Sequence, residues 1–84
     1  GAKDFYTAKP VLFPNPSMDQ SFELAFPITM PVTVSIFDAS GRLVWSGLVS
    51  TNEKVEINRQ FASGLYCVDA KLGSNSTRIP WIVN

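Results

Sequence analysis

The sequence predicts an all-β fold, a seven-stranded antiparallel β-sandwich of the immunoglobulin-like type. Val, Ile and Thr contribute 18 residues and Phe, Tyr and Trp another 10, so a third of the 84-residue chain favours strands. Apolar and polar side chains alternate in repeated short runs, and no window shows the i, i+3, i+4, i+7 spacing of an amphipathic helix. Turn signals separate the runs at intervals of about ten residues, as in a β-sandwich. A small β-barrel is the alternative fold.

Size and charge restrict the function. A chain of 84 residues and 9.2 kDa allows one domain. Seven basic and seven acidic residues give a net charge of zero, so the sequence lacks the excess positive charge that attracts nucleic acid. The absence of His and the single Cys argue against a metal site, a cofactor and an internal disulfide. No apolar run is long enough for a membrane helix, and the first residues lack the apolar stretch of a secretory signal.

The chain opens with an aperiodic segment, residues 1–9, which we interpret as a linker. Its first two residues, Gly1 and Ala2, are consistent with a cloning remnant. The domain proper is expected over residues 10–84. Its first strand, Pro10–Phe13, is predicted to be an edge strand that ends in a rigid turn with two prolines. Within this turn, Asn15 can bond its own backbone in an Asx-turn.

Two alternating runs follow, Ser21–Phe26 and Val32–Asp38. The next segment, Asp38–Arg42, is the strongest turn signal in the chain. Gly41 supplies a positive φ there, and the Asp38 carboxylate can accept backbone N–H bonds across the turn.

Four further strands complete the set: Leu43–Ser50, Val55–Asn58, Gly64–Leu72 and Ser76–Asn84. An irregular crossing over residues 59–63, held by Phe61, joins the strand Val55–Asn58 to the strand Gly64–Leu72. Pro80 lacks a backbone N–H, so the last strand must lie at a free edge or carry a bulge.

Candidates for chemistry are few. The seven carboxylates are scattered one per element, which does not suggest a catalytic pair. Cys67 has no His or other base nearby in the pattern to activate its thiol. Trp45 and Trp81 could form a sugar-binding platform, but core or half-buried positions are favoured for both. We therefore expect no enzyme activity, and a binding or structural role.

Three segments resemble the motifs of one known family. Residues 12–17 (LFPNPS) resemble its opening motif, with Pro14, Asn15 and Pro16. Residues 34–44 (VSIFDASGRLV) resemble its central strand–turn–strand, with Asp38, Gly41 and Arg42. Residues 61–66 (FASGLY) resemble its late motif, with Gly64 and Tyr66. The family is the type A C-terminal sorting domain of the type IX (Por) secretion system of Bacteroidetes, and the resemblance covers residues 10–84.

This resemblance implies an immunoglobulin-like secretion signal carried by an N-terminal cargo domain in the same chain. It implies transit through the periplasm and the outer membrane, with the cargo reaching the cell surface or the medium. The implied partners are the outer-membrane shuttle barrel and a sortase-like cysteine protease, which would cut within residues 1–9. A homodimer through an edge strand is left open. The alternative function is a non-catalytic spacer or carbohydrate-binding module of a secreted enzyme.

Recognition in this family depends on the last strand and the chain end. The corresponding residues here are Thr77, Arg78, Ile79, Trp81, Ile82, Val83 and Asn84. We hypothesise that the unpaired edge of this strand recruits another chain by strand addition. In this hypothesis, apolar side chains such as Ile79, Trp81 and Val83 fill pockets of the partner.

Overall fold

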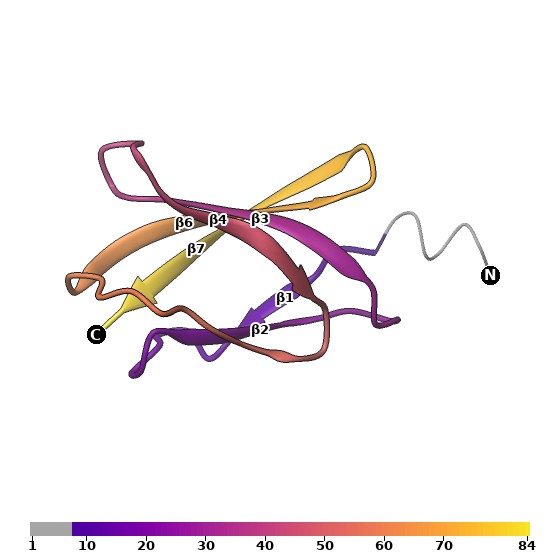
Figure 1. Cartoon of the computed structure of the whole chain (residues 1–84), viewed down its shortest axis with the longest axis horizontal. Helices are drawn as coiled ribbons and strands as arrows, with labels where there is room; N and C mark the ends of the chain where they lie inside the picture. The colour runs from indigo at the N-terminus through magenta and orange to yellow at the C-terminus, as the bar shows by residue number, and fades with distance from the viewer. Residues whose placement is uncertain (1–7) are drawn as a thin grey trace.

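The computed structural model describes residues 8–84, which form seven strands in two antiparallel sheets that face each other (Figure 1). This confirms the predicted all-β sandwich, and the division into two separate sheets excludes a closed barrel. The described residues include no helix that could span a membrane. Residues 1–7 of the expected linker lie outside the described part of the chain, so the 1–9 boundary remains a prediction.

The smaller sheet has the order β1-β2-β5, with β1 at Val11–Phe13, β2 at Ser21–Ala25 and β5 at Lys54–Glu56. The predicted edge position of the first strand is thus confirmed. β5 is shorter than expected, although Val55 and Ile57 both face the core.

The larger sheet has the order β4-β3-β6-β7. It comprises β3 (Pro31–Phe37), β4 (Leu43–Ser50), β6 (Gly64–Leu72) and β7 (Asn75–Val83). In a constant-type immunoglobulin domain the fourth strand belongs to the sheet of the first strand, whereas here β4 pairs with β3. The last strand of the chain, β7, therefore forms one free side of the larger sheet.

One apolar core fills the space between the sheets. On β3 the side chains of Val32, Val34 and Ile36 are at most 1% exposed, and Val68 and Ala70 of β6 are fully buried. The period-two alternation explains this pattern, because every second side chain of a strand points to the same face. The crossing between β5 and β6 contributes Phe61, which is buried as expected.

The two hairpin turns of the larger sheet lie at opposite ends of the molecule (Figure 1). The β3–β4 turn lies at the same end as the start of β6 and the end of β7, because Phe37 pairs with Cys67 and Gly64 pairs with Val83. The second and third motifs, residues 34–44 and 61–66, therefore both reach the end of the sheet at which β7 terminates.

Candidate functional site at the chain end

The register of β7 shows which of its backbone groups face away from the sheet. β7 pairs with β6 without a shift, from Asn75 opposite Leu72 to Val83 opposite Gly64. The N–H and C=O of Ile82 both bond outside this ladder, so even-numbered residues of β7 direct their backbone groups outward. Pro80 occupies such a position and costs the ladder no donor. Its expected place on a sheet edge is confirmed.

The turn with two prolines covers the last part of this edge. The Asn15 side chain donates from Nδ2 to the carbonyl of Pro80 (2.7 Å) and accepts the N–H of Ile82 at Oδ1 (2.9 Å). The expected Asx-turn is therefore wrong, because both ends of this carboxamide are used 65 and 67 residues away. The side chain takes the place that an adjacent strand would occupy.

Ser17 continues the same contact with its backbone. It donates to the carbonyl of Ile82 (2.7 Å) and accepts from the N–H of Asn84 (2.9 Å), which makes a parallel bridge to the end of β7. Its side chain is fully buried, and its hydroxyl donates to the carbonyl of Ser21. Sequence reasoning missed this role of Ser17, although the small residue after the prolines was a visible signal.

These contacts correct the hypothesis of an unpaired edge. The outward groups of Pro80, Ile82 and Asn84 are bonded to residues 15–17. By the same alternation, the backbone groups of Ser76 and Arg78 also face outward, and within residues 8–84 they have no partner across the edge. At this edge of the larger sheet, strand addition to the folded domain is thus open only along the first half of β7.

The side chains of β7 divide between the core and the surface. Trp81 and Val83 are 0% and 2% exposed, so their side chains cannot fill a partner's pockets while the domain is folded. That part of the hypothesis is wrong, because the core already uses this face. The outer face carries Ile82, which is 42% exposed, opposite Leu65 of β6 at 53%. Recognition of residues 77–84 by a partner remains a prediction.

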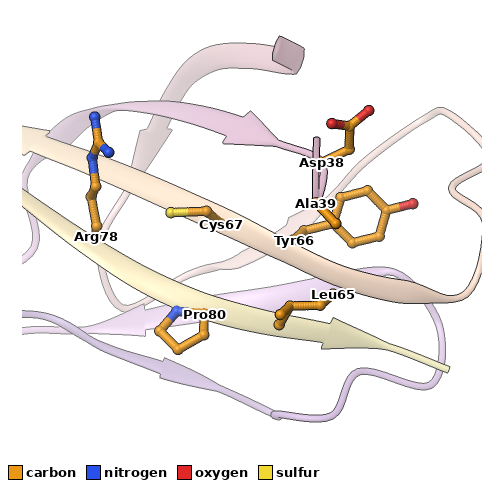
Figure 2. A pocket seen from close by; sticks show the side chains of 7 residues that line it. All are labelled: Asp38, Ala39, Leu65, Tyr66, Cys67, Arg78 and Pro80. Carbon is orange, nitrogen blue, oxygen red and sulfur yellow. The ribbon is translucent and has the colours of Figure 1, made fainter. Parts of the chain in front are cut away.

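A shallow hollow lies on the outer face beside this apolar pair. Its volume is about 300 Å³. Figure 2 shows that β6 and β7 supply most of its lining and that the β3–β4 turn supplies the rest. The lining residues are Asp38, Ala39, Leu65, Tyr66, Cys67, Arg78 and Pro80. The Arg78 guanidinium lies 3.4 Å from Asp69, so the positive charge at the rim has a carboxylate partner.

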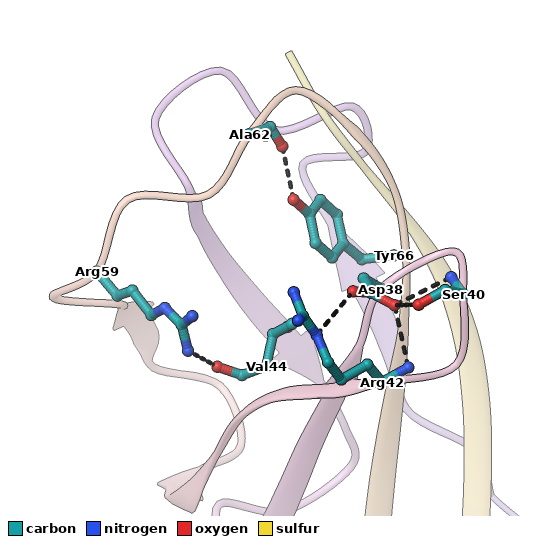
Figure 3. Close-up of polar contacts among 7 residues, drawn as sticks. All are labelled: Asp38, Ser40, Arg42, Val44, Arg59, Ala62 and Tyr66. Atoms are coloured by element: carbon teal, nitrogen blue, oxygen red, sulfur yellow. Dashed lines mark hydrogen bonds and ion pairs between the residues drawn. The ribbon is translucent and has the colours of Figure 1, made fainter.

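The β3–β4 turn is built around the Asp38 carboxylate (Figure 3). Its Oδ1 accepts from the Ser40 hydroxyl (2.6 Å), the Ser40 N–H (3.0 Å) and the Arg42 N–H (3.0 Å). These bonds, with the Ser40 hydroxyl first and the nearby Arg42 charge last, hold the pKa of Asp38 below its ordinary value. Gly41 has the expected positive φ of 88°. The ion pair of Arg42 with Asp38 (3.4 Å) is also present as expected.

The third motif opens β6 directly opposite the chain end. Gly64 pairs with Val83 and Tyr66 pairs with Trp81. The Tyr66 hydroxyl donates to the carbonyl of Ala62 (2.7 Å), which holds the crossing against the strand (Figure 3). The motif therefore fixes the strand that supports the end of β7.

The three motifs meet around residues 80–83. The first motif bonds Pro80 and Ile82 through Asn15, the second lines the hollow beside Pro80 through Asp38, and the third pairs with Val83. Arg42 is not among the residues that line this hollow; it pairs with Asp38 of its own turn, and its side chain is 78% exposed. In this chain these motifs act structurally, because their polar groups position the backbone.

Within residues 8–84 no three carboxylate or thiol side chains gather closely enough to hold a metal ion. Cys67 lies half-buried on the outer face with Asp69 and Lys71, as the alternation predicts. Trp45 is half-buried against the core and Trp81 is fully buried, so the two rings form no exposed platform for a sugar.

The comparisons with known proteins agree with this geometry. The family described as the secretion system C-terminal sorting domain matches residues 11–84. No curated protein matches the sequence. Among solved structures, the dimeric latent PorU from Porphyromonas gingivalis is similar over 88% of this chain, with 26% identity and a TM-score of 0.55. This chain spans 9% of the length of that protein. The chain thus belongs to the secretion system C-terminal sorting domain family, the C-terminal sorting signals of type IX secretion.

Proposed function

We propose that the folded domain acts as an address label that the type IX apparatus reads at the chain end, residues 77–84. The observation that carries this proposal is the meeting of all three motifs around residues 80–83. Three separated segments fix the position of the last strand and leave Ile82 and Leu65 exposed beside it. Exposed apolar pairs of this kind mark interaction sites more often than single apolar residues do.

The partners in this proposal are the outer-membrane shuttle barrel and the sortase-like cysteine protease of the type IX system. The shuttle would bind the domain in the periplasm, and the protease would cut within residues 1–9 once the cargo is outside. The cargo would precede the domain in the same chain and would be released or attached to the cell surface. The similarity to a domain-sized part of the much longer PorU supports an attachment to a larger protein.

The domain itself is proposed to have no catalytic activity. Its family consists of cargo tags, and the carboxylates within residues 8–84 support turns, form ion pairs or lie in solvent. A homodimer is a separate proposal, supported by the free backbone groups of Ser76 and Arg78 at the β7 edge.

Export of a fused reporter tests the recognition proposal. A signal-bearing reporter is joined to this domain and expressed in a bacterium with a type IX system. Removal of Ile82–Asn84 would abolish export, whereas undiminished export would reject the proposal. Because this truncation also removes the buried Val83, the surface variant Ile82→Ser with a circular dichroism measurement separates lost recognition from lost folding.

A further inference from the structure

The Asn15 side chain reproduces the hydrogen bonding of a neighbouring strand. A carboxamide has a donor and an acceptor spaced much like those of a peptide group. At the β7 edge it satisfies the carbonyl of Pro80 and the N–H of Ile82 together. Asn52 makes the same pair of bonds elsewhere in the domain, to the N–H and the carbonyl of Phe26, both at 2.9 Å.

The two amides differ in what they hold. Asn52 lies in the β4–β5 turn and holds Phe26 in the loop after β2, and its own N–H bonds to the carbonyl of Leu24 in the smaller sheet. Both amides are exposed, but Asn15 holds only the last strand, β7. Exposed hydrogen bonds contribute little to global stability because water competes for the same groups. The contact of Asn15 is therefore better suited to fixing a local position than to stabilising the fold.

Position matters here because the chain end has few other restraints on its outer side. Trp81 and Val83 fix the inner face of β7 by packing. On the outer edge, residues 80–84 are held by hydrogen bonds to Asn15 and Ser17 and by a contact of the Asn84 side-chain amide with the sulfur of Met18 (3.5 Å). Loss of the Asn15 bonds would free the Ile82 N–H and the Pro80 carbonyl, while the Ile82 carbonyl would keep its bond to Ser17 and the core would stay intact.

We propose that Asn15 is a positioning residue for the recognition segment: it closes the edge of residues 80–82 to strand addition and presents the Ile82 side chain in one fixed orientation. This inference rests on the proposed function, since it assumes that the export apparatus reads residues 77–84. A partner would then bind the side chains of this end and would not add a strand to it.

Amide exchange in the isolated domain, which the structure describes as one continuous sandwich, tests the local effect. Asn15→Ala removes both bonds, and Asn15→Asp keeps the acceptor for the Ile82 N–H but loses the donor to Pro80. We expect the Ile82 amide to exchange about tenfold faster in Asn15→Ala, with Val34 and Val68 unchanged. The control Asn52→Ala removes the same kind of bond pair and also strains a backbone with a φ of 61°, so it costs at least as much stability. It should nevertheless leave Ile82 exchange at the wild-type rate. Equal exchange of Ile82 in Asn15→Ala and wild type would overturn the inference.

Export of the reporter tests the functional effect. We expect Asn15→Ala and Asn15→Asp to reduce export, and Asn52→Ala to leave it near the wild-type level at a matched or greater loss of thermal stability. If Asn15→Ala frees Ile82 but export is unchanged, while Ile82→Ser abolishes export, the positioning role is wrong and the recognition proposal stands. If Ile82→Ser also leaves export unchanged, the recognition proposal itself fails. Should Asn15→Ala not fold, Asn15→Asp decides through export alone, because it keeps the acceptor for the Ile82 N–H and loses only the donor to Pro80. Reduced export of this variant would support the positioning role, and export at the wild-type level would overturn it.

Discussion

The indole ring of Trp81 in β7 packs edge-to-face against Phe22 in β2, with ring centroids 5.2 Å apart and ring planes at 68°. This contact ties the last strand of one sheet to the central strand of the other. Phe61 and Tyr66 surround the same indole. Its N–H has no hydrogen-bond partner within residues 8–84, so packing alone anchors it. The strand that we propose as the recognition segment is thus also part of the core.

Removal of this anchor should strongly destabilise the domain. Trp81→Ala deletes a fully buried side chain, and such changes cost about 3–5 kcal/mol. A domain of this size has a total stability of about 4–13 kcal/mol. Urea unfolding measures the loss, and Ile82→Ala on the exposed face of the same strand is the control, with an expected cost below about 1 kcal/mol. Equal losses of unfolding free energy in Trp81→Ala and Ile82→Ala would contradict the placement of Trp81 in the core and Ile82 on the surface.

The alternation of β7 shows what a sequence can and cannot predict. Period two groups Ile79, Trp81 and Val83, and the structure shows that they share one face of β7. The pattern does not say whether an apolar face packs on its own domain or on a partner, since both remove it from water. Only the second sheet, which presents Phe22 to Trp81, decides this.

The strands themselves followed from local chemistry. β4 and β6 begin and end where alternation and turn residues predicted, because both depend on neighbours along the chain. The Asp38 turn was predictable for the same reason. The contact of Asn15 with Pro80 and Ile82 was not, because it joins residues 65 and 67 positions apart and requires the sheet order.

Gly47 leaves room for the half-buried Trp45 on the same strand. A Cβ atom at Gly47 would lie 2.8 Å from Cη2 and 2.9 Å from Cζ2 of this ring, closer than van der Waals contact allows. Gly47→Ala should displace the indole and cost about 1–3 kcal/mol, as overpacking does. Thermal unfolding and a red shift of Trp fluorescence measure the effect. Ser46→Ala, on the exposed face beside it, should change neither, and an unchanged Gly47→Ala spectrum would refute the packing described.

Gly41 has a φ of 88°, where a Cβ atom is unfavourable. Nothing lies within 4 Å of the Cβ position, so the cost of Gly41→Ala comes from the backbone alone. We expect a loss of about 1–2 kcal/mol in unfolding free energy. Gly41→Asn should lose less, because Asn tolerates the left-handed region better. A greater loss with Asn than with Ala would show that side-chain bulk, and not backbone conformation, sets the cost.

The Asp38 turn should make the domain sensitive to acid. Because its bonds lower the pKa of Asp38 in the folded state, the carboxylate contributes stability at pH values above its unfolded pKa of about 3.9. That contribution is lost as the pH falls through the lower folded pKa. Asp38→Asn should therefore reduce stability at pH 7 and flatten its decline below about pH 4. Urea unfolding from pH 7 to pH 2.5 measures both slopes, and parallel curves for the variant and wild type would be evidence against this role of the carboxylate.

Export of a reporter that carries this domain tests the central claim most directly. The reporter, with a secretory signal at its start and this domain at its end, is expressed in Porphyromonas gingivalis and quantified in the periplasm, at the cell surface and in the medium. The account predicts that the tagged reporter leaves the periplasm, and that Ile82→Ser retains it there while the domain stays folded. Retention of the wild-type fusion in the periplasm, or export of Ile82→Ser at the wild-type level, would contradict an address read at the chain end.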